Sequence, residues 1–590
     1  MRRIVRFIVA SLAVLGLLSL LVIGLGVWGV VALHGKGQPL PKQMLLTLDL
    51  ENEFKDAPSS DPFSALSGED TYITREVVDG IDRAAKDPRV VGLFATIGQS
   101  ELGMGRAQEI RDAVQRFRAS GKPAVLFAET MGEFGNGTVE YYLASAFGQV
   151  WLQPSGDVGL TGFMAESPFL RGTLDMLGIE PQFAGRKEYK TAIEMFTDKK
   201  FSPANVETLN GLLDAWSTQV VAGIADGRKM PAEKVRALFG KGPFLAAEAL
   251  AAGLVDHLGY RDEAMAAASA GSNQPDEVDV AAYAADAPSA KGTRVALITG
   301  EGAIMRGESS GPFGSEEGFG SDTVAQALRD AIDDDRIKAI LFRVDSPGGS
   351  YVASDTIWHE VRRARAAGKP VVVSMGNVAA SGGYFVAMGA DRIIAQPGTV
   401  TGSIGVFTGK MVMADFWPKL GITWDELHRG DNAPMWSVNR GFSPQAWERV
   451  NVMLDRIYAD FTTKAAEGRK MPVDKLEGYA RGRVWSGAEA KSLGLVDALG
   501  GYDVATAELR GLLKLAADAP LQMVPFPAPE GPFEMLSKLA SRGGMAESKD
   551  AETLMRAARV LAPVVERLEV MDPRQRGALS LPLSASDLPK

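Results

Sequence analysis

The sequence contains no cysteine and only four histidines among its 590 residues. The absence of cysteine excludes disulfide bonds, cysteine nucleophiles and thiolate metal sites. The histidines are scattered, with no HExxH motif and no paired spacing, and they are His34, His257, His359 and His428. This distribution argues against a zinc enzyme. We therefore expect neither a metal nor another cofactor.

The sequence also lacks an excess of positive charge. It has 63 Lys and Arg and 73 Asp and Glu, which gives a net charge of -10. Binding to nucleic-acid phosphates requires a basic surface, so nucleic acid is not an expected partner. The hydrophobic fraction of 46% and the charged fraction of 23% are typical of globular proteins. The length suggests three or four domains.

The N-terminus carries a long uncharged run. Arg2, Arg3 and Arg6 precede 27 residues without charge, from Phe7 to Leu33. Such a run can cross a hydrocarbon core of ~30 Å, whereas the apolar part of a signal peptide usually has only ~7–15 residues. We expect residues 1–35 to be a transmembrane anchor in a lipid bilayer. The positive-inside rule places the arginines in the cytoplasm and the chain from about residue 36 outside it. A long cleaved signal peptide is the alternative.

The chain contains a tandem repeat. GIEPQFAGRKEYK, ADGRKMP and GLVDHLG, within 178–259, match GITWDELHRGDNA, AEGRKMP and GLVDALG, within 421–500. The offset is 243 at Gly178/Gly421 and 241 at Gly227/Gly468. The two segments are therefore copies of one structural unit.

Each copy alternates strand and helix patterns. Residues 44–50 and 295–300 open the two copies, and β-branched apolar runs follow at 90–98 and 337–345. GKPAVLFAE and GKPVVVSMG supply the next strand of each. Such runs between helices predict parallel strands covered on both faces, and thus an α/β fold. We predict a first domain at 44–270, an Ala-, Asp- and Pro-rich linker at 271–292, a second domain at 293–505, and a tail at 506–590 with a helical pattern at 551–570.

A candidate nucleophile occurs only in the second copy. NVAASGGY contains Ser381, whereas the first copy has EFGNGTVEYY there. Small residues allow a sharp turn into a helix, where free N–H groups, such as that of Gly382, can hold an oxyanion. DSPGGS, at 345–350, ends a buried strand and offers the N–H groups of Gly348 and Gly349. The first copy has IGQSELG instead. A plain tight turn is the alternative for the Ser-Gly-Gly sequence alone.

A candidate base occurs only in the first copy. His359 and His428 have no orienting carboxylate at a motif spacing, so we look for a lysine. A desolvated lysine can be a general base, because burial disfavours its charged form. Lys190 lies in RKEYKTA, and the matching residue of the second copy is Ala433; Lys187 is a rival. A Ser/Lys dyad assembled between the halves is therefore predicted.

At these residues the chain resembles the signal peptide peptidase A family in its long tandem-repeat form, peptidase family S49 of the Clp protease/crotonase superfamily. The resemblance covers about residues 40–505 and depends on RVDSPGGS, AASGGY, PGTVTGSIGV and EYKTAIEMF. It implies two tandem crotonase-like (ClpP-like) α/β domains. It also implies that Ser381 is the nucleophile, that Lys190 is the general base, and that Ser403 in TGSIG orients the lysine.

The resemblance further implies a serine endopeptidase that degrades released signal peptides and other extended hydrophobic peptides. It would assemble as a ring- or dome-shaped homotetramer on the bacterial inner membrane, with its catalytic domains on the periplasmic side. Two alternatives stay open at this point. One is another crotonase-fold enzyme, acting on acyl thioesters, and the other is a membrane scaffold that has lost catalysis.

Overall fold

The computed structural model describes residues 40–58, 71–269, 271–272, 275–286, 291–309 and 318–528. The predicted anchor at 1–35 and the helical pattern at 551–570 lie outside these ranges. Among the residues described, no helix combines the length and the apolar character needed to span a bilayer.

The first copy of the repeat forms a six-stranded sheet with the order β10-β6-β5-β4-β1-β11. Every neighbouring pair in it is parallel. Its strands are β1 (Met44–Asp49), β4 (Val90–Thr96), β5 (Ala124–Ala128), β6 (Gln149–Leu152), β10 (His257–Leu258) and β11 (Asp276–Asp279). One face packs on α2 (Thr74–Ala84), α3 (Gly103–Ala119), α4 (Thr138–Ala144) and α11 (Val280–Ala285). The other face packs on α10 (Arg261–Ala268).

The second copy repeats this plan with the strand order β20-β18-β16-β15-β12-β22, and β17 and β21 extend the sheet beside β16. All its pairs are parallel except β18 with β20. Its strands are β12 (Thr293–Glu301), β15 (Ile337–Ser346), β16 (Val371–Ala380), β17 (Arg392–Ala395), β18 (Val400–Gly402), β20 (Val484–Ser486), β21 (Ala498–Leu499) and β22 (Leu521–Phe526). Helices α12 (Ser321–Asp333), α13 (Tyr351–Ala366) and α14 (Gly382–Ala387) cover one face, and α18 (Tyr502–Leu512) covers the other.

The α/β class and the parallel strands predicted from the sequence are confirmed. Side chains on both faces of the central strands are buried, as in the run from Met44 to Leu46 of β1 and the run from Ala339 to Val344 of β15. Burial on both faces explains why these strands are continuous apolar runs instead of alternating ones.

Two domain boundaries differ from the prediction. Residues 276–285 of the predicted linker form β11 and α11, and β11 pairs with β1 of the first sheet. Residues 521–526 of the predicted tail form β22, which pairs with β12 of the second sheet. Each copy thus returns to place its last strand beside its first. β11, DEVD, was concealed because a short edge strand needs few apolar side chains. β22, LQMVPF, was concealed because it contains Pro525 and runs into a proline-rich stretch, which is typical of a tail.

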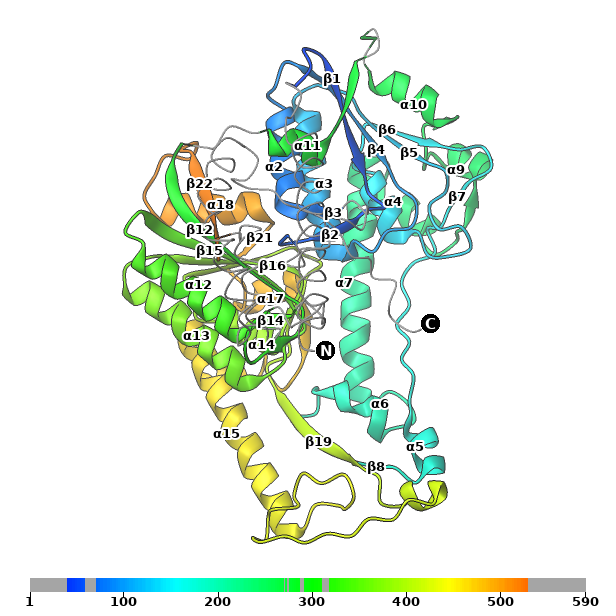
Figure 1. The fold of residues 1–590 in the computed structure, drawn as a ribbon. Helices are drawn as coiled ribbons and strands as arrows, with labels where there is room; N and C mark the ends of the chain where they lie inside the picture. Colours follow the sequence, from blue (N-terminus) through cyan, green and yellow to red (C-terminus); the bar gives the residue numbers. More distant parts are fainter. Residues whose placement is uncertain are drawn as a thin grey trace, which may run out of the picture.

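Two long helices and an antiparallel ribbon connect the copies. Helices α7 (Pro203–Gly227) and α15 (Pro444–Gly468) have 25 residues each and begin with a serine N-cap followed by proline. Between their far ends, β8 (Glu180–Arg186) of the first copy pairs with β19 (Val406–Val412) of the second. Figure 1 shows this ribbon below the two sheets, between α7 and α15. The ribbon joins segments more than 200 residues apart.

The remaining short elements connect these parts. They are β2 (Glu53–Lys55), β3 (Thr71–Ile73), β7 (Asp157–Val158), α5 (Arg171–Leu177), η2 (Thr191–Ile193), α6 (Glu194–Thr197), α8 (Ala232–Leu238), β9 (Phe244–Leu245), α9 (Ala246–Ala252), β13 (Ile304–Met305), β14 (Phe319–Gly320), η3 (Trp417–Leu420), α16 (Val473–Glu477) and α17 (Gly487–Leu493).

Candidate active site

Ser381 lies at the sharp turn between β16 and α14. It is the N-cap residue of α14, with φ 53° and ψ -114°. A non-glycine residue in this region costs roughly 1–3 kcal/mol, and such residues persist only where the surroundings hold them. The surroundings here do so, because the N–H of Ser381 donates to the carbonyl of Gly402 at 2.9 Å and every residue of α14 is buried. The turn directs the hydroxyl to the end of the sheet.

Lys190 reaches this serine from the first copy. Lys190 follows β8. The backbone N–H of the residue before it, Tyr189, donates to the carbonyl of Arg481 in the second copy at 3.2 Å. The Nζ of Lys190 lies 3.0 Å from the Oγ of Ser381, 3.0 Å from the carbonyl oxygen of Ser403 and 2.9 Å from the Oγ of Ser403. The ribbon of β8 and β19 therefore brings the predicted lysine to the predicted serine.

The lysine is 7% exposed, and no carboxylate among the described residues forms an ion pair with it. Burial disfavours the ammonium form and lowers the pKa of Lys190 from 10.5 to about 8. About a tenth of the side chain is then a neutral amine at pH 7, and about half at pH 8. This is the state that a general base requires.

The three contacts of the amine suit both protonation states: an ammonium donates to all three oxygens, and in the neutral amine one contact is left to the lone pair. A neutral amine has two N–H donors and one lone pair, and the carbonyl of Ser403 can only accept. One N–H therefore goes to that carbonyl and the second goes to the Ser403 hydroxyl. The lone pair is left for the hydroxyl of Ser381, which donates to it. The geometry can thus carry a proton from the serine to the lysine.

The two N–H groups best placed for an oxyanion are those of Gly349 and Gly382. Both residues line the cavity in front of Ser381. Neither N–H donates to another residue in the described part of the chain. Gly382 is the first residue of α14, and the first N–H groups of a helix have no partner within it. The bridge between Gly349 and Ile304 is made by the carbonyl of Gly348 and the N–H of Ser350, so the N–H of Gly349 takes no part in it. These donors can hold the oxygen of a tetrahedral intermediate.

Gly348 differs from the prediction. Its N–H donates to the Oγ of Ser346 at 3.1 Å, so it is not a free oxyanion donor. Its φ is 107°, and a Cβ atom would lie 2.7 Å from the nitrogen of Gly382 and 2.8 Å from the Cβ of Ser381. Glycine is required here because the loop passes directly against the serine turn.

The dyad opens into a cavity of about 480 Å³ whose wall comes from both copies. A volume of this size is typical of small-molecule and peptide side-chain pockets. Lys190 is the only charged residue among the described residues that line it. Most of the apolar wall was not predicted from the sequence, and it includes Leu209, Tyr351, Phe385, Val406, Phe407, Ile457, Phe461 and Val484.

The structure separates the other candidates from this site. Lys187 is exposed and lies 3.3 Å from Glu477, in an ion pair. His359 and His428 are exposed and do not line the cavity. Ala433 lies in the exposed loop between β19 and α15. Among these candidates, only Lys190 contacts Ser381.

The fold and the site define a class: a serine hydrolase built on two parallel-sheet α/β domains, in which a serine oxygen, a lysine amine and two backbone N–H groups meet at one cavity. The sequence profile described as "Peptidase family S49" matches residues 116–274 and 363–516, one segment in each copy. The chain belongs to peptidase family S49 and is a serine protease.

Several proteases are similar to most of the chain. The "Serine protease SPPA, chloroplastic" of Arabidopsis thaliana is 33% identical over 82% of this chain and 71% of its own length. The "Protease 4" of Salmonella typhi is 31% identical over 87% of this chain and 85% of its own length. The "Protease 4" of Haemophilus influenzae is 30% identical over 81% of this chain and 80% of its own length. The similarity therefore extends over both copies of the repeat.

Proposed function

We propose that the protein is a membrane-anchored endopeptidase in which Ser381 attacks the peptide bond and Lys190 is the general base, and that it degrades released signal peptides. The observation that carries the proposal is the 3.0 Å contact between Nζ of Lys190 and Oγ of Ser381 in an apolar cavity. Family membership favours a peptidase over a thioester-transforming enzyme. The retention of both reactive groups at one site argues against an inactive scaffold.

The chemistry follows from the contacts. The Oγ of Ser381 attacks the carbonyl carbon of the peptide while its proton passes to the Nζ of Lys190. The carbonyl oxygen becomes an oxyanion that accepts hydrogen bonds from the N–H groups of Gly349 and Gly382. The ammonium then protonates the leaving amine, the C–N bond breaks and an acyl-serine remains. A water molecule, deprotonated by Lys190, hydrolyses this ester and regenerates the serine.

The proposed substrates are extended, apolar peptides. Among the described residues, the cavity wall offers aromatic and aliphatic side chains and no fixed charge except the amine of Lys190, so burying a charged side chain there would be unfavourable. Signal peptides have apolar central segments. The "Putative signal peptide peptidase SppA" of Enterococcus faecium, 30% identical over 34% of this chain, supports this substrate class.

We place the protein in the bacterial inner membrane, with the catalytic domains on the periplasmic side. The support is the uncharged run from Phe7 to Leu33 with its preceding arginines. An anchored protease would act on peptides that remain in or near the bilayer. Fractionation of cells followed by protease protection tests this placement, and loss of the membrane signal on removal of residues 1–35 is the expected result.

We also propose assembly into a homotetramer through segments that the repeat leaves unpaired. In the first copy, residues at about 163–170 correspond to β19, and in the second, residues at about 421–430 correspond to β8. Neither segment is a strand in the structure. Several large apolar side chains in them are exposed, including Met164 at 75% and Leu427 at 96%. A second copy could pair with them as β8 pairs with β19.

The assembly is tested by light scattering of the detergent-solubilised full chain. The expected mass is about four times that of one chain. Leu427→Arg should reduce the mass to that of the monomer, because it places a charge in the proposed contact, whereas Lys234→Arg, an exposed change elsewhere, should not. A wild-type monomer would contradict the proposal.

The catalytic proposal is tested with a fluorophosphonate, which labels activated serines. We expect one labelled residue, Ser381, in the purified wild-type chain and no label in Ser381→Ala. Cleavage of a synthetic signal peptide should be lost in the same variant. Labelling of another serine, or cleavage that survives Ser381→Ala, would contradict the proposed nucleophile.

A further inference from the structure

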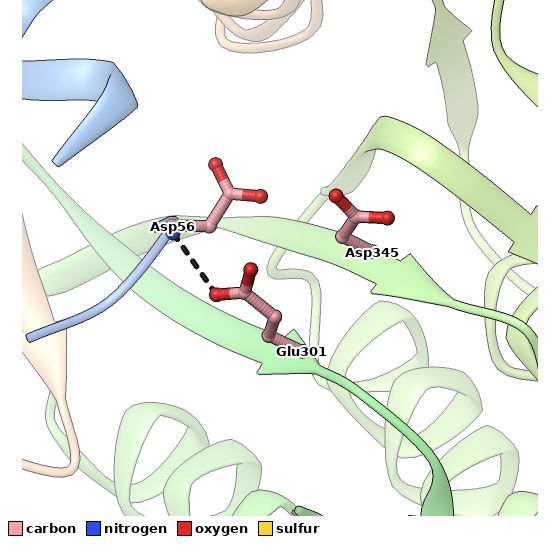
Figure 2. A group of neighbouring side chains, drawn as sticks. All are labelled: Asp56, Glu301 and Asp345. Carbon is pink, nitrogen blue, oxygen red and sulfur yellow. Dashed lines mark hydrogen bonds between the residues drawn. The ribbon is translucent and has the colours of Figure 1, made fainter. Parts of the chain in front are cut away.

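A buried group of charged side chains lies where the two copies meet, away from the cavity. Asp56 follows β2, Glu301 ends β12, and Asp345 lies near the end of β15. Figure 2 shows their three carboxylates facing one another, with the N–H of Asp56 donating to Glu301 at 3.0 Å. One oxygen from each of the three lies within 4.8 Å of the others. Such a group requires positive charge nearby.

Arginine supplies that charge. The guanidinium of Arg106, on α3 of the first copy, contacts all three carboxylates and lies 3.3 Å from Asp56 and 3.1 Å from Asp345. Arg343, which is fully buried, lies 3.1 Å from the other oxygen of Asp56. Arg106 thus occupies the position that a cation would take, so we do not interpret the group as a metal site.

Asp345 connects this group to the strand that carries the nucleophile. The ladder between β15 and β16 shifts register beside Asp345. The N–H groups of Asn377 and Val378 donate to the Asp345 carboxylate at 3.2 and 3.0 Å. A Cβ atom on Gly376 would lie 2.6 Å from the same carboxylate. The carboxylate therefore sets the path of β16 only three residues before Ser381.

The first copy also contacts β16 directly, through the side chain of Asn377. The side chain of Asn377 accepts from the N–H of Arg106 at 3.0 Å and donates to the carbonyl of Leu102 at 2.9 Å. Arg106 therefore contacts β16 through its backbone and, by way of Asp345, through its guanidinium. Asp345 also lies in the strand that continues into the loop of Gly349, so both halves of the oxyanion site depend on its position.

We propose that Arg106 is a positioning residue for the nucleophile: it holds the Asp345 carboxylate, and thereby the backbone before Ser381, in the reactive geometry. The inference rests on the proposed role of Ser381. The first copy thus contributes more than the lysine. It also sets the direction of the serine turn, because a displacement of β16 moves the hydroxyl relative to both Lys190 and the N–H of Gly349.

The test uses the full-length chain in detergent, with a fluorogenic apolar peptide and a fluorophosphonate as probes. Arg106→Gln should lower kcat and the labelling rate of Ser381 by about tenfold to hundredfold, because small displacements of reacting groups have effects of this size. The KM should stay within about twofold, since the cavity wall is untouched. Arg106→Lys should recover part of the loss, because it restores the positive charge.

Arg116→Gln is the matched control. Arg116 lies on the same helix and also pairs across the copies, with Asp503 at 2.9 Å, but it does not contact β16. It should keep kcat within about twofold of wild type and lose less thermal stability than Arg106→Gln, because its ion pairs are partly exposed. If Arg106→Gln does not fold, Asn377→Ala replaces it. That variant removes only the two neutral hydrogen bonds to α3 and should lower the labelling rate without changing KM.

The outcomes separate the two proposals. If Ser381→Ala abolishes labelling while folded Arg106→Gln and Asn377→Ala label at the wild-type rate, the positioning role is wrong and the nucleophile stands. An equal loss in Arg116→Gln would also overturn it, because the effect would then come from general docking of the copies. If Ser381→Ala still labels and cleaves, the proposed function itself fails.

Discussion

Lys190 contacts Ser403 at two atoms: its Nζ lies 3.0 Å from the carbonyl oxygen and 2.9 Å from the hydroxyl of a residue 213 positions away. These contacts take both N–H groups of a neutral amine and leave its lone pair for Ser381. Ser403 has φ 51°, a backbone conformation that turns its carbonyl and its hydroxyl toward the same nitrogen. The orienting role of Ser403 stays a prediction, and these two contacts are its geometric basis.

The first prediction concerns the dyad. Ser381→Ala and Lys190→Ala should each lower kcat by at least about a thousandfold, and the double variant should be no worse, since residues that act as a unit are not additive. Steady-state cleavage of a signal peptide measures this. Lys187→Ala is the matched control and should keep near wild-type activity, because Lys187 is exposed and paired with Glu477. An inactive Lys187→Ala with an active Lys190→Ala would refute the assignment.

The second prediction is the pH dependence of activity. The pKa of Lys190 is lowered to about 8 by burial, and only the neutral amine can accept the proton of Ser381. Activity should therefore rise with pH through about 8 and then level off. A pH profile of kcat/KM measures the midpoint. EDTA should have no effect, because the proposed mechanism uses no metal; inhibition by the chelator would count against it.

The third prediction is that the lysine lowers stability. Its pKa is 10.5 ordinarily and about 8 when folded, so the unfolded chain binds the proton more tightly. The resulting cost, on the order of 3 kcal/mol, is fully present below pH 8 and disappears as the pH rises toward 10.5. Lys190→Met should therefore raise the free energy of unfolding at pH 7 but not near pH 10.5. Denaturant titrations at the two pH values measure this, and an equal effect at both would contradict the burial argument.

The fourth prediction concerns the loop against the serine turn. Gly348→Ala should abolish labelling of Ser381, because the added Cβ would collide with the nitrogen of Gly382 and the Cβ of Ser381. Gly368→Ala is the control, since Gly368 also has a positive φ, 78°, but has open space around its Cβ position. It should lose a similar amount of stability from backbone strain and stay active. Normal labelling in folded Gly348→Ala would show that the loop can move aside.

The fifth prediction is that neither copy is active alone. A fragment of residues 291–528 contains Ser381 but not Lys190. A fragment of residues 40–286 contains Lys190 but not Ser381. We expect a mixture of the two to regain some activity, and each alone to have none. Ending the second fragment at 505 should impair folding, because it removes β22 from the sheet. Activity of the second fragment alone would rule out the composite site.

Much of this architecture follows from sequence alone. Apolar runs such as 90–98 and 337–345 predicted parallel strands because a strand buried on both faces must be apolar throughout. The repeat predicted two similar domains, and comparison of its copies singled out Ser381 and Lys190 as residues kept in opposite halves. The strand predictions were confirmed because they depend on local periodicity, and the assignment of Ser381 and Lys190 rests on chemistry that only a few residue types can perform.

Only the tertiary structure decided how those residues act together. The ribbon of β8 and β19 brings Lys190 to Ser381, and the packing of both copies around the amine removes its solvent and lowers its pKa. The engagement of the Gly348 N–H, the edge strands β11 and β22, and the contacts of Arg106 across the copies were also absent from the sequence reading. Each depends on groups that are distant along the chain, and local patterns carry no information on which distant groups will be adjacent or how completely they exclude water.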